Sequence, residues 1–265
     1  MRLPASSLPL SHFTQSSSGL PSHSDRQNTA NMRPFFIRAN VLESAKGSAY
    51  IEMGNTKLVC SVDGPKEITV SSDSGDAYSE GILNVRVKFA VFSHQERTVS
   101  DADAHRRIGD PTELETKLAA NIQDGLSPAV CLDRIPRAQI DINCTILEDQ
   151  GGVLSAALIC ASSALADAGI DMYDLVLSSS LAVVDNDQMI VDPSTTCLAD
   201  KPISGSVTVA LMPSLNQVVT CEQSGACSPE TLRKAIRLAT ECCVKLHPLV
   251  QKALVTSVRL RSRPK

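Results

Sequence analysis

The sequence predicts an α/β protein, in which strands and helices alternate along the chain and pack in layers. Residues from Ile140 to Ile146 alternate between apolar and polar, the pattern of a strand with one buried face. The glycine pair Gly151-Gly152 ends this strand, and apolar residues then recur at helical spacing from Leu154 to Ala168. Gly169 stands where a left-handed helix C-cap is expected. Strand patterns followed by a helix pattern occur on both sides of this unit, so the second half of the chain repeats the logic of the first.

The first 31 residues predict a disordered tail. They contain eight serines between Ser6 and Ser24, three prolines and no sustained periodicity. We therefore expect a folded domain at residues 32–265. No continuous apolar stretch follows Arg2, so a secretory signal is not expected, although a mitochondrial targeting peptide remains an alternative for a serine-rich segment with few acidic residues.

The first half of the folded domain predicts four strands and one polar loop. Gly54-Asn55 is typical of a hairpin turn between two of these strands. The residues from Pro65 to Gly81 are polar and predict a loop. The expected strands are 35–37, 48–53, 56–62 and 82–91.

The segment from Phe92 to Asp110 is polar and without periodicity, which predicts a surface loop. It carries three arginines, Arg97, Arg106 and Arg107. A solvated cluster of charges beside the acidic residues of the same loop is one reading of these arginines, since charge runs are often no more than a soluble surface. Arg134 and Arg137, just before the strand at 140–146, are interpreted as ordinary surface or ion-pair residues.

A helix is predicted to begin at Asp110-Pro111-Thr112-Glu113. Asp110 would be the N-cap, Pro111 the first helical residue, and Glu113 the acidic residue three positions after the cap. The helix should end near Pro128, and its expected apolar stripe consists of Leu114, Leu118, Ile122 and Leu126.

The second half predicts two strand pairs and a final helix. Strands are expected at 175–184, 188–191, 205–212 and 217–221, with a turn at 185–187. Ser228 should cap the last helix, with Pro229 at its first position. Pro248 should break or kink this helix, because proline lacks the N–H that a helix interior needs.

Composition describes an ordinary folded protein. The chain has a net charge of −4 and 43% hydrophobic residues, and no apolar run approaches the roughly 20 residues of a membrane-spanning helix. The acidic balance argues against strong non-specific binding of nucleic acid by the isolated chain, because that affinity scales with the phosphates neutralised.

The nine cysteines do not predict a metal or redox site. No C-x-x-C pair occurs, and Cys60, Cys144 and Cys160 fall on apolar faces of expected elements. We interpret the cysteines as reduced thiols of a nuclear or cytosolic protein. The five histidines are scattered, and none pairs with a nucleophile. No cofactor and no metal are expected.

Three segments resemble the ribonuclease PH family, and they occur in the same order. They are AKGSAYIEMGNTKLVCSVDGP at 45–65, LEDQGGVLSAALICASSALADAGIDMYDLV at 147–176 and VALMPSLNQVV at 209–219. Within this family the chain looks most like the ring subunits of the eukaryotic exosome. The resemblance implies an α/β (α+β) fold of two pseudo-duplicated, βαβ-type halves with mixed sheets and packed helices.

The same resemblance implies a degenerate catalytic site. Active members carry aspartate-glycine-glycine-threonine-arginine where this chain has Gln150 to Leu154, so the hydroxyl donor is replaced by Val153 and the guanidinium by Leu154. The paired aspartates of active members match Asp192 and Leu198, and Asp200 could take the second place only through a gap. We therefore expect no catalytic residues and a structural, RNA-channelling role; the alternative is a phosphate-dependent 3′–5′ exoribonuclease active in its own right.

The family also implies partners and a location. The expected partners are other ribonuclease PH-like exosome ring subunits, with exosome component seven as the neighbour, exosome cap subunits, and single-stranded RNA passing through the ring, but no membrane. The resemblance places Arg97, Arg106 and Arg107 near the residues that grip RNA in the family, an alternative to the solvated cluster. The expected location is the nucleus, nucleolus and cytoplasm.

Overall fold

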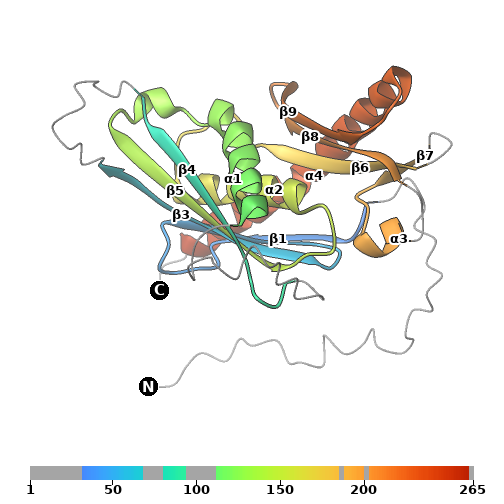
Figure 1. Cartoon of the computed structure of the whole chain (residues 1–265). Coiled ribbons are helices and arrows are strands. Elements are labelled where there is room, and N and C mark those ends of the chain that lie inside the picture. The colour runs from blue at the N-terminus through green and yellow to red at the C-terminus, as the bar shows by residue number, and fades with distance from the viewer. Residues whose placement is uncertain (1–31, 68–79, 94–111, 185–187, 200–202, 263–265) are drawn as a thin grey trace.

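The structure, a computed structural model, describes residues 32–67, 80–93, 112–184, 188–199 and 203–262. Two β-sheets pack around helices, with helix α2 lying between them (Figure 1). The predicted tail at 1–31, the three arginines of the 92–110 loop, the turn at 185–187 and Asp200 lie outside the described residues. The α/β class is confirmed.

The first sheet has five strands in the order β1-β2-β3-β5-β4. Neighbouring strands are antiparallel except β4 and β5, which are parallel and make the sheet mixed. The predicted strands are present, but β3 runs five residues beyond the expected end at Val62, and β4 ends at Phe89 rather than Val91. The strand bounds are β1 Phe35–Ala39, β2 Gly47–Met53, β3 Thr56–Glu67, β4 Ile82–Phe89 and β5 Ala138–Glu148.

The second sheet has four antiparallel strands in the order β7-β6-β8-β9. Every residue of β6 is buried, because α4 covers one face of this strand and α2 packs against it as well. The strand bounds are β6 Leu177–Val184, β7 Gln188–Val191, β8 Ile203–Met212 and β9 Gln217–Gly225.

The helices are α1 Glu113–Leu126, α2 Val153–Ala168, α3 Thr195–Ala199 and α4 Pro229–Arg261, with short 3₁₀ turns at Ser127–Ala129 and Leu132–Arg134. Helix α2 ends at Gly169 in the predicted left-handed conformation, with φ of 73°. The structure adds α3, which the sequence reading did not anticipate. None of the described helices combines the length and apolarity needed to cross a bilayer.

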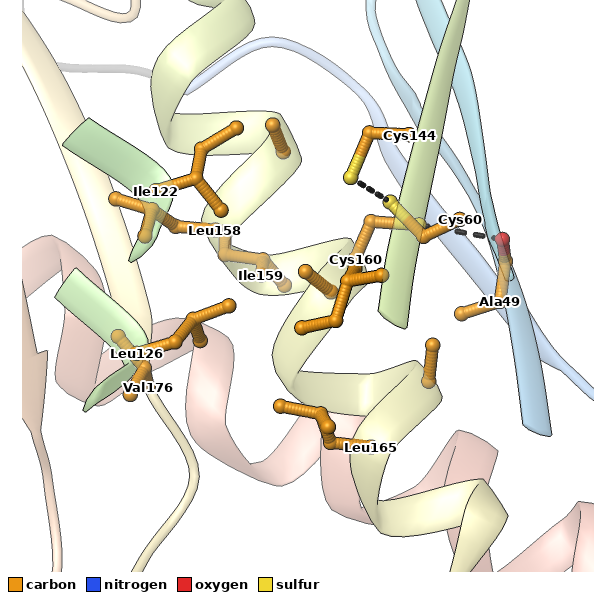
Figure 2. Packing of buried hydrophobic residues seen from close by; sticks show 14 of the residues in the cluster. Ala49, Cys60, Ile122, Leu126, Cys144, Leu158, Ile159, Cys160, Leu165 and Val176 are labelled. Carbon is orange, nitrogen blue, oxygen red and sulfur yellow. Dashed lines mark hydrogen bonds between the residues drawn. The ribbon is translucent and has the colours of Figure 1, made fainter. Parts of the chain in front are cut away.

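Helix α2 forms the centre of the larger hydrophobic core. It contacts β2 and β3 of the first sheet and β6 and β8 of the second, so nearly its whole circumference is buried. Its alanines and serines permit this close approach, because small side chains let two sheets pack on one helix. Figure 2 shows Leu158, Ile159 and Leu165 of α2 among the buried side chains, with Ile122 and Leu126 of α1 nearby.

Three cysteines meet between α2 and the first sheet. Cys60 and Cys144 are register partners on β3 and β5 with their sulfurs 3.0 Å apart, and the Cys160 thiol donates to the Ala49 carbonyl at 3.2 Å (Figure 2). Burial, followed by contact with the other two thiols, raises the pKa of Cys60 well above its ordinary value. None of the nine cysteines forms a disulfide in the structure.

The predicted start of α1 is wrong. The N-cap is Thr112 rather than Asp110, and it forms a capping box with Glu115. Glu115 is also bound to the first sheet, because its carboxylate accepts from the Phe89 N–H at 2.9 Å. This docking turns Leu114, expected in the apolar stripe, out to solvent with 67% exposure, whereas Ile122 and Leu126 are fully buried.

The predicted break at Pro248 is also wrong, because α4 continues through it to Arg261. Pro248 lies on the exposed side of the helix, while Leu246 and Val250 on either side of it are buried. Packing of these neighbours holds the helix together across the one hydrogen bond that proline removes.

We predict that Gly47→Ala destabilises the protein strongly. A Cβ at Gly47 would collide with the backbone nitrogen of Ala168 and the carbonyl oxygen of Ala164 in α2, and backbone atoms cannot move aside. Overpacking of this kind should lower the free energy of unfolding by about 3 kcal/mol. Gly169→Ala is the control, because its Cβ meets nothing within 4 Å and costs only the left-handed backbone, about 1–2 kcal/mol. Urea denaturation of both variants tests this, and equal losses would contradict it.

Candidate functional site

The turn between β5 and α2 is the candidate site, because it lies where the two sheets approach each other. Gly151 and Gly152 both have left-handed backbones, with φ of 96° and 70°. The Gly151 N–H donates to the Asp149 carboxylate at 2.9 Å, which tightens the turn. Gly152 is the N-cap of α2 and provides no side-chain cap. The start of the helix therefore keeps unsatisfied N–H donors, a feature that favours an anion.

Asp192, which directly follows β7, lies beside this turn. A Cβ added to Gly152 would be 3.0 Å from the Asp192 carboxylate and 3.2 Å from the Ser180 hydroxyl, so glycine is required for close approach as well as for its φ. Asp192 is 1% exposed and has a left-handed φ of 49°, an unusual backbone for a residue with a side chain. The surrounding contacts must hold it there.

Arg33 supplies the main contact to Asp192. The Arg33 Nε–H donates to one carboxylate oxygen at 2.8 Å and an Nη2–H to the other at 2.6 Å, forming a bidentate ion pair. The two side chains are 6% and 2% exposed. Burying an isolated charge costs much free energy, so Arg33 and Asp192 can each remain buried and charged only because the other is present.

The remaining donors of Arg33 are used on the glycine turn. They reach the Gln150 carbonyl at 3.3 Å, the Gly151 carbonyl at 3.0 Å and the Thr56 hydroxyl at 3.5 Å. Together with the two bonds to Asp192, these contacts match the five N–H groups that an arginine carries. Thr56 reinforces the turn by donating to the Gly151 carbonyl at 2.7 Å and accepting from the Gln150 N–H at 3.2 Å. Arg33 therefore has no donor left for a ligand.

A pocket of about 370 Å³ opens in front of the turn. Val153 and Leu118 contribute apolar side chains to its lining. Among the described lining residues Lys117 is the one cationic side chain, and it lies 3.8 Å from the Glu222 carboxylate in an exposed ion pair that neutralises it. The described residues of the pocket consequently present little positive charge apart from the helix N-terminus.

The structure brings some predicted residues together and leaves others apart. Asp192 is adjacent to the glycine turn, as the family pattern implies, whereas Leu198 lies half-buried on α3 and contributes no charge. Arg134 forms an exposed ion pair with Asp171 at 3.0 Å, which confirms its surface interpretation, and Arg137 is exposed. Asp200, Arg97, Arg106 and Arg107 lie outside the described residues.

Sequence reasoning missed Arg33 and Thr56. Arg33 directly follows the serine-rich segment, and nothing in the local pattern distinguishes it from the other arginines. Thr56 reads as an ordinary strand residue after a Gly-Asn turn. Only the fold brings these residues to a turn about 100 positions later in the chain, at separations of 94 to 118 residues.

Comparison with known proteins identifies relatives over most of the chain. Residues 31–171 match the family model of ribonuclease PH, described as the 3′ exoribonuclease family, domain 1. The human exosome complex component MTR3 is 37% identical over 238 residues, covering 89% of this chain and 87% of the relative. The exosome complex component Rrp41 of Nitrosopumilus maritimus is 32% identical and covers 87% of this chain and 88% of the relative.

Solved structures share the fold. Rice (Oryza sativa) Rrp46 superposes with a TM-score of 0.72 at 20% identity, covering 87% of this chain and 99% of that one. A chain of the Archaeoglobus fulgidus exosome with RNA bound to the active site gives a TM-score of 0.67 at 21% identity, covering 83% and 89%.

We predict that Arg33→Met lowers the free energy of unfolding by about 3–5 kcal/mol, because it leaves the Asp192 carboxylate buried without a partner. Lys57→Met is the matched control: it removes an exposed ion pair with Glu148, in which the side chains are 40% and 39% exposed, and should cost about 1 kcal/mol or less. The double variant Arg33→Met with Asp192→Leu should recover part of the loss. Urea denaturation measures all three, and a similar small loss for Arg33→Met and Lys57→Met would show that the buried pair is not essential.

Proposed function

Because this chain belongs to the ribonuclease PH family of 3′ exoribonucleases, we propose that it is a non-catalytic subunit of the RNA exosome ring. In this role it supports 3′–5′ RNA processing and degradation, including rRNA processing and mRNA turnover, by scaffolding the ring and channelling RNA. The identity of 37% to a human exosome complex component over nearly the whole chain supports the assembly. The contacts of the glycine turn support the absence of catalysis.

The observation that carries this proposal is the closed network of Arg33. Phosphorolysis needs cationic and hydroxyl groups that hold inorganic phosphate, and a carboxylate near the scissile bond. Arg33 donates only to protein atoms, and both oxygens of Asp192 accept from Arg33. The guanidinium and carboxylate that could serve a ligand here are thus bound to each other.

The residues that open α2 supply no replacement. Val153 lines the pocket where active members have a hydroxyl, and Leu154 stands where they have a guanidinium. Leucine offers no hydrogen bond to a phosphate oxygen, whereas arginine offers a bidentate one. The backbone donors at the helix N-terminus remain, but alone they hold an anion without activating it for attack.

A phosphate-dependent exoribonuclease active in its own right is the second candidate. The retained Asp192 beside the glycine turn and the uncapped N-terminus of α2 favour it. Leu198 supplies no second carboxylate, and among the described residues the cations beside the turn are already paired, so these two features do not complete a site.

The proposal extends to RNA contacts, partners and location. Arg97, Arg106 and Arg107 would line the RNA path of the assembled ring, contacting phosphates rather than bases. The neighbours would be other ribonuclease PH-like subunits, with exosome component seven next in the ring, and the cap subunits. The assembly would work in the nucleus, nucleolus and cytoplasm.

We predict that the purified chain releases no nucleoside diphosphates from single-stranded RNA in the presence of phosphate and a divalent metal. Val153→Thr with Leu154→Arg should remain inactive, because rebuilding donors leaves the carboxylate pair incomplete at Leu198. Loss of one electrostatic group typically costs about 10²–10³ in rate, and several losses together leave no measurable activity. Phosphate-dependent release by the wild-type chain, abolished by Asp192→Asn, would establish the enzyme instead.

Replacing Arg106 and Arg107 with alanine should weaken RNA binding by the assembled complex. Loss of two phosphate contacts on a single strand lowers the slope of log affinity against log salt by about 1.4. Arg134→Ala with Arg137→Ala is the matched control, since it removes two exposed arginines outside the 92–110 loop. Filter binding at several salt concentrations measures the slopes, and the solvated-cluster reading predicts the same slope for both variants.

A further inference from the structure

A groove of about 750 Å³ runs between β1 and the C-terminal half of α4, away from the glycine turn. One wall is the edge of the first sheet and the other is α4 from Leu249 to Leu260. Consecutive residues of β1 line the groove, although their side chains alternate between the two faces of the sheet. The groove therefore follows the main chain of the strand, and β1 and α4 also lie close together in Figure 1.

The edge of β1 that faces this groove carries backbone groups that no other described residue pairs. Within the described sheet, β1 pairs only with β2. The Asn40 N–H donates to the Ser48 carbonyl and the Gly54 N–H to the Pro34 carbonyl, so even-numbered residues bond to β2. In an antiparallel pair the alternate residues point their N–H and C=O groups the other way. These residues are Phe35, Ile37 and Ala39.

Apolar side chains flank the open edge on both walls. Phe36 on β1 is 51% exposed, and Leu249 and Leu260 on α4 are 49% and 58% exposed. Val41 extends the apolar surface beyond the end of the strand with 38% exposure. Proteins normally protect an edge strand by covering it or by placing charges along it, and clustered exposed apolar residues mark contact surfaces.

The rim of the groove is positively charged. Lys252 lines the groove, and Lys245 and Arg259 lie seven residues before and after it, which places them on the same side of α4; all three are exposed. Arg38 adds a further exposed cation from β1, while Glu43 is the only carboxylate among the described residues that line the groove. None of these four basic side chains forms an ion pair with another described residue. This rim favours an acidic occupant.

The walls also match in length. Five residues of β1 extend about 17 Å at roughly 3.4 Å per residue, and α4 covers about 17 Å from Leu249 to Leu260 at 1.5 Å per residue. A groove between an edge strand and a helix, with apolar walls and free backbone groups, is suited to an added strand.

We propose that this groove binds an extended, acidic segment of a partner protein, which adds to β1 as a sixth strand. Its backbone bonds to Phe35, Ile37 and Ala39, and its apolar side chains, at alternate positions, pack against Leu249 and Leu260. Its acidic side chains, at the intervening positions, point to the other face, where Arg38 lies, and its overall negative charge complements Lys252 on the helix wall. The evidence for this binding surface is independent of the exosome assignment, because it consists of the open edge of β1 and the charges of the rim.

A fluorescein-labelled peptide of sequence Glu-Val-Glu-Val-Glu-Val, added to the full-length chain, tests the proposal by fluorescence anisotropy. A peptide with the same residues in two blocks, Val-Val-Val-Glu-Glu-Glu, retains the charge and loses the alternation. A third peptide, N-methylated at alternate residues, retains both and loses the strand hydrogen bonds. We expect the first peptide to bind at least tenfold more tightly than the other two, and to slow amide exchange in residues 35–39.

Variants of the protein test the rim. Arg38→Glu with Lys252→Glu should weaken binding of the alternating peptide at least tenfold, whereas Lys234→Glu, an exposed lysine of α4 outside the groove, should leave it unchanged. Absence of binding at millimolar peptide, or equal binding of all three peptides, would overturn the proposal. So would a concentration-dependent dimer in sedimentation velocity that Arg38→Glu dissociates, because a second copy would then be the occupant.

Discussion

The buried ion pair between Arg33 and Asp192 is the constraint on which the rest of this structure depends. Arg33 precedes the first strand of one sheet, and Asp192 follows β7 in the other, so the pair joins the two sheets directly. The remaining N–H donors of Arg33 bind the glycine turn, and α2 begins at this turn between the two sheets. Charges this deeply buried are tolerated only when every donor and acceptor is satisfied, and here the five N–H groups of Arg33 all have partners.

This arrangement connects stability with function. The glycine turn has the shape and the helix N-terminus of an anion site, but its neighbouring guanidinium and carboxylate neutralise each other, and Val153 and Leu154 add only apolar surface. These two charged groups therefore serve internal structure rather than a ligand. Under the proposed function the chain contributes to the assembly through its surfaces. Two described surfaces differ in character: the pocket before α2 and the basic, apolar groove along β1.

The sequence was informative wherever one face of an element is buried. The apolar–polar alternation from Ile140 to Ile146 is visible in the sequence because one face of β5 is buried, and the small residues of α2 are visible because the helix packs closely on both sheets. Gly169 is predictable because the helix ends in a left-handed residue, which favours glycine. The start of α1 and the continuity of α4 depend on tertiary contacts instead, through the Glu115 bond to β4 and the buried neighbours of Pro248. The partnership of Arg33 with Asp192 spans 159 residues, a separation at which local pattern carries no information.

Native mass spectrometry of the complex purified through this chain shows whether the protein functions as one part of a ring. We expect a single stable assembly in which this chain is accompanied by other ribonuclease PH-like subunits and cap subunits. Recovery of the chain alone, or only as copies of itself, would contradict it.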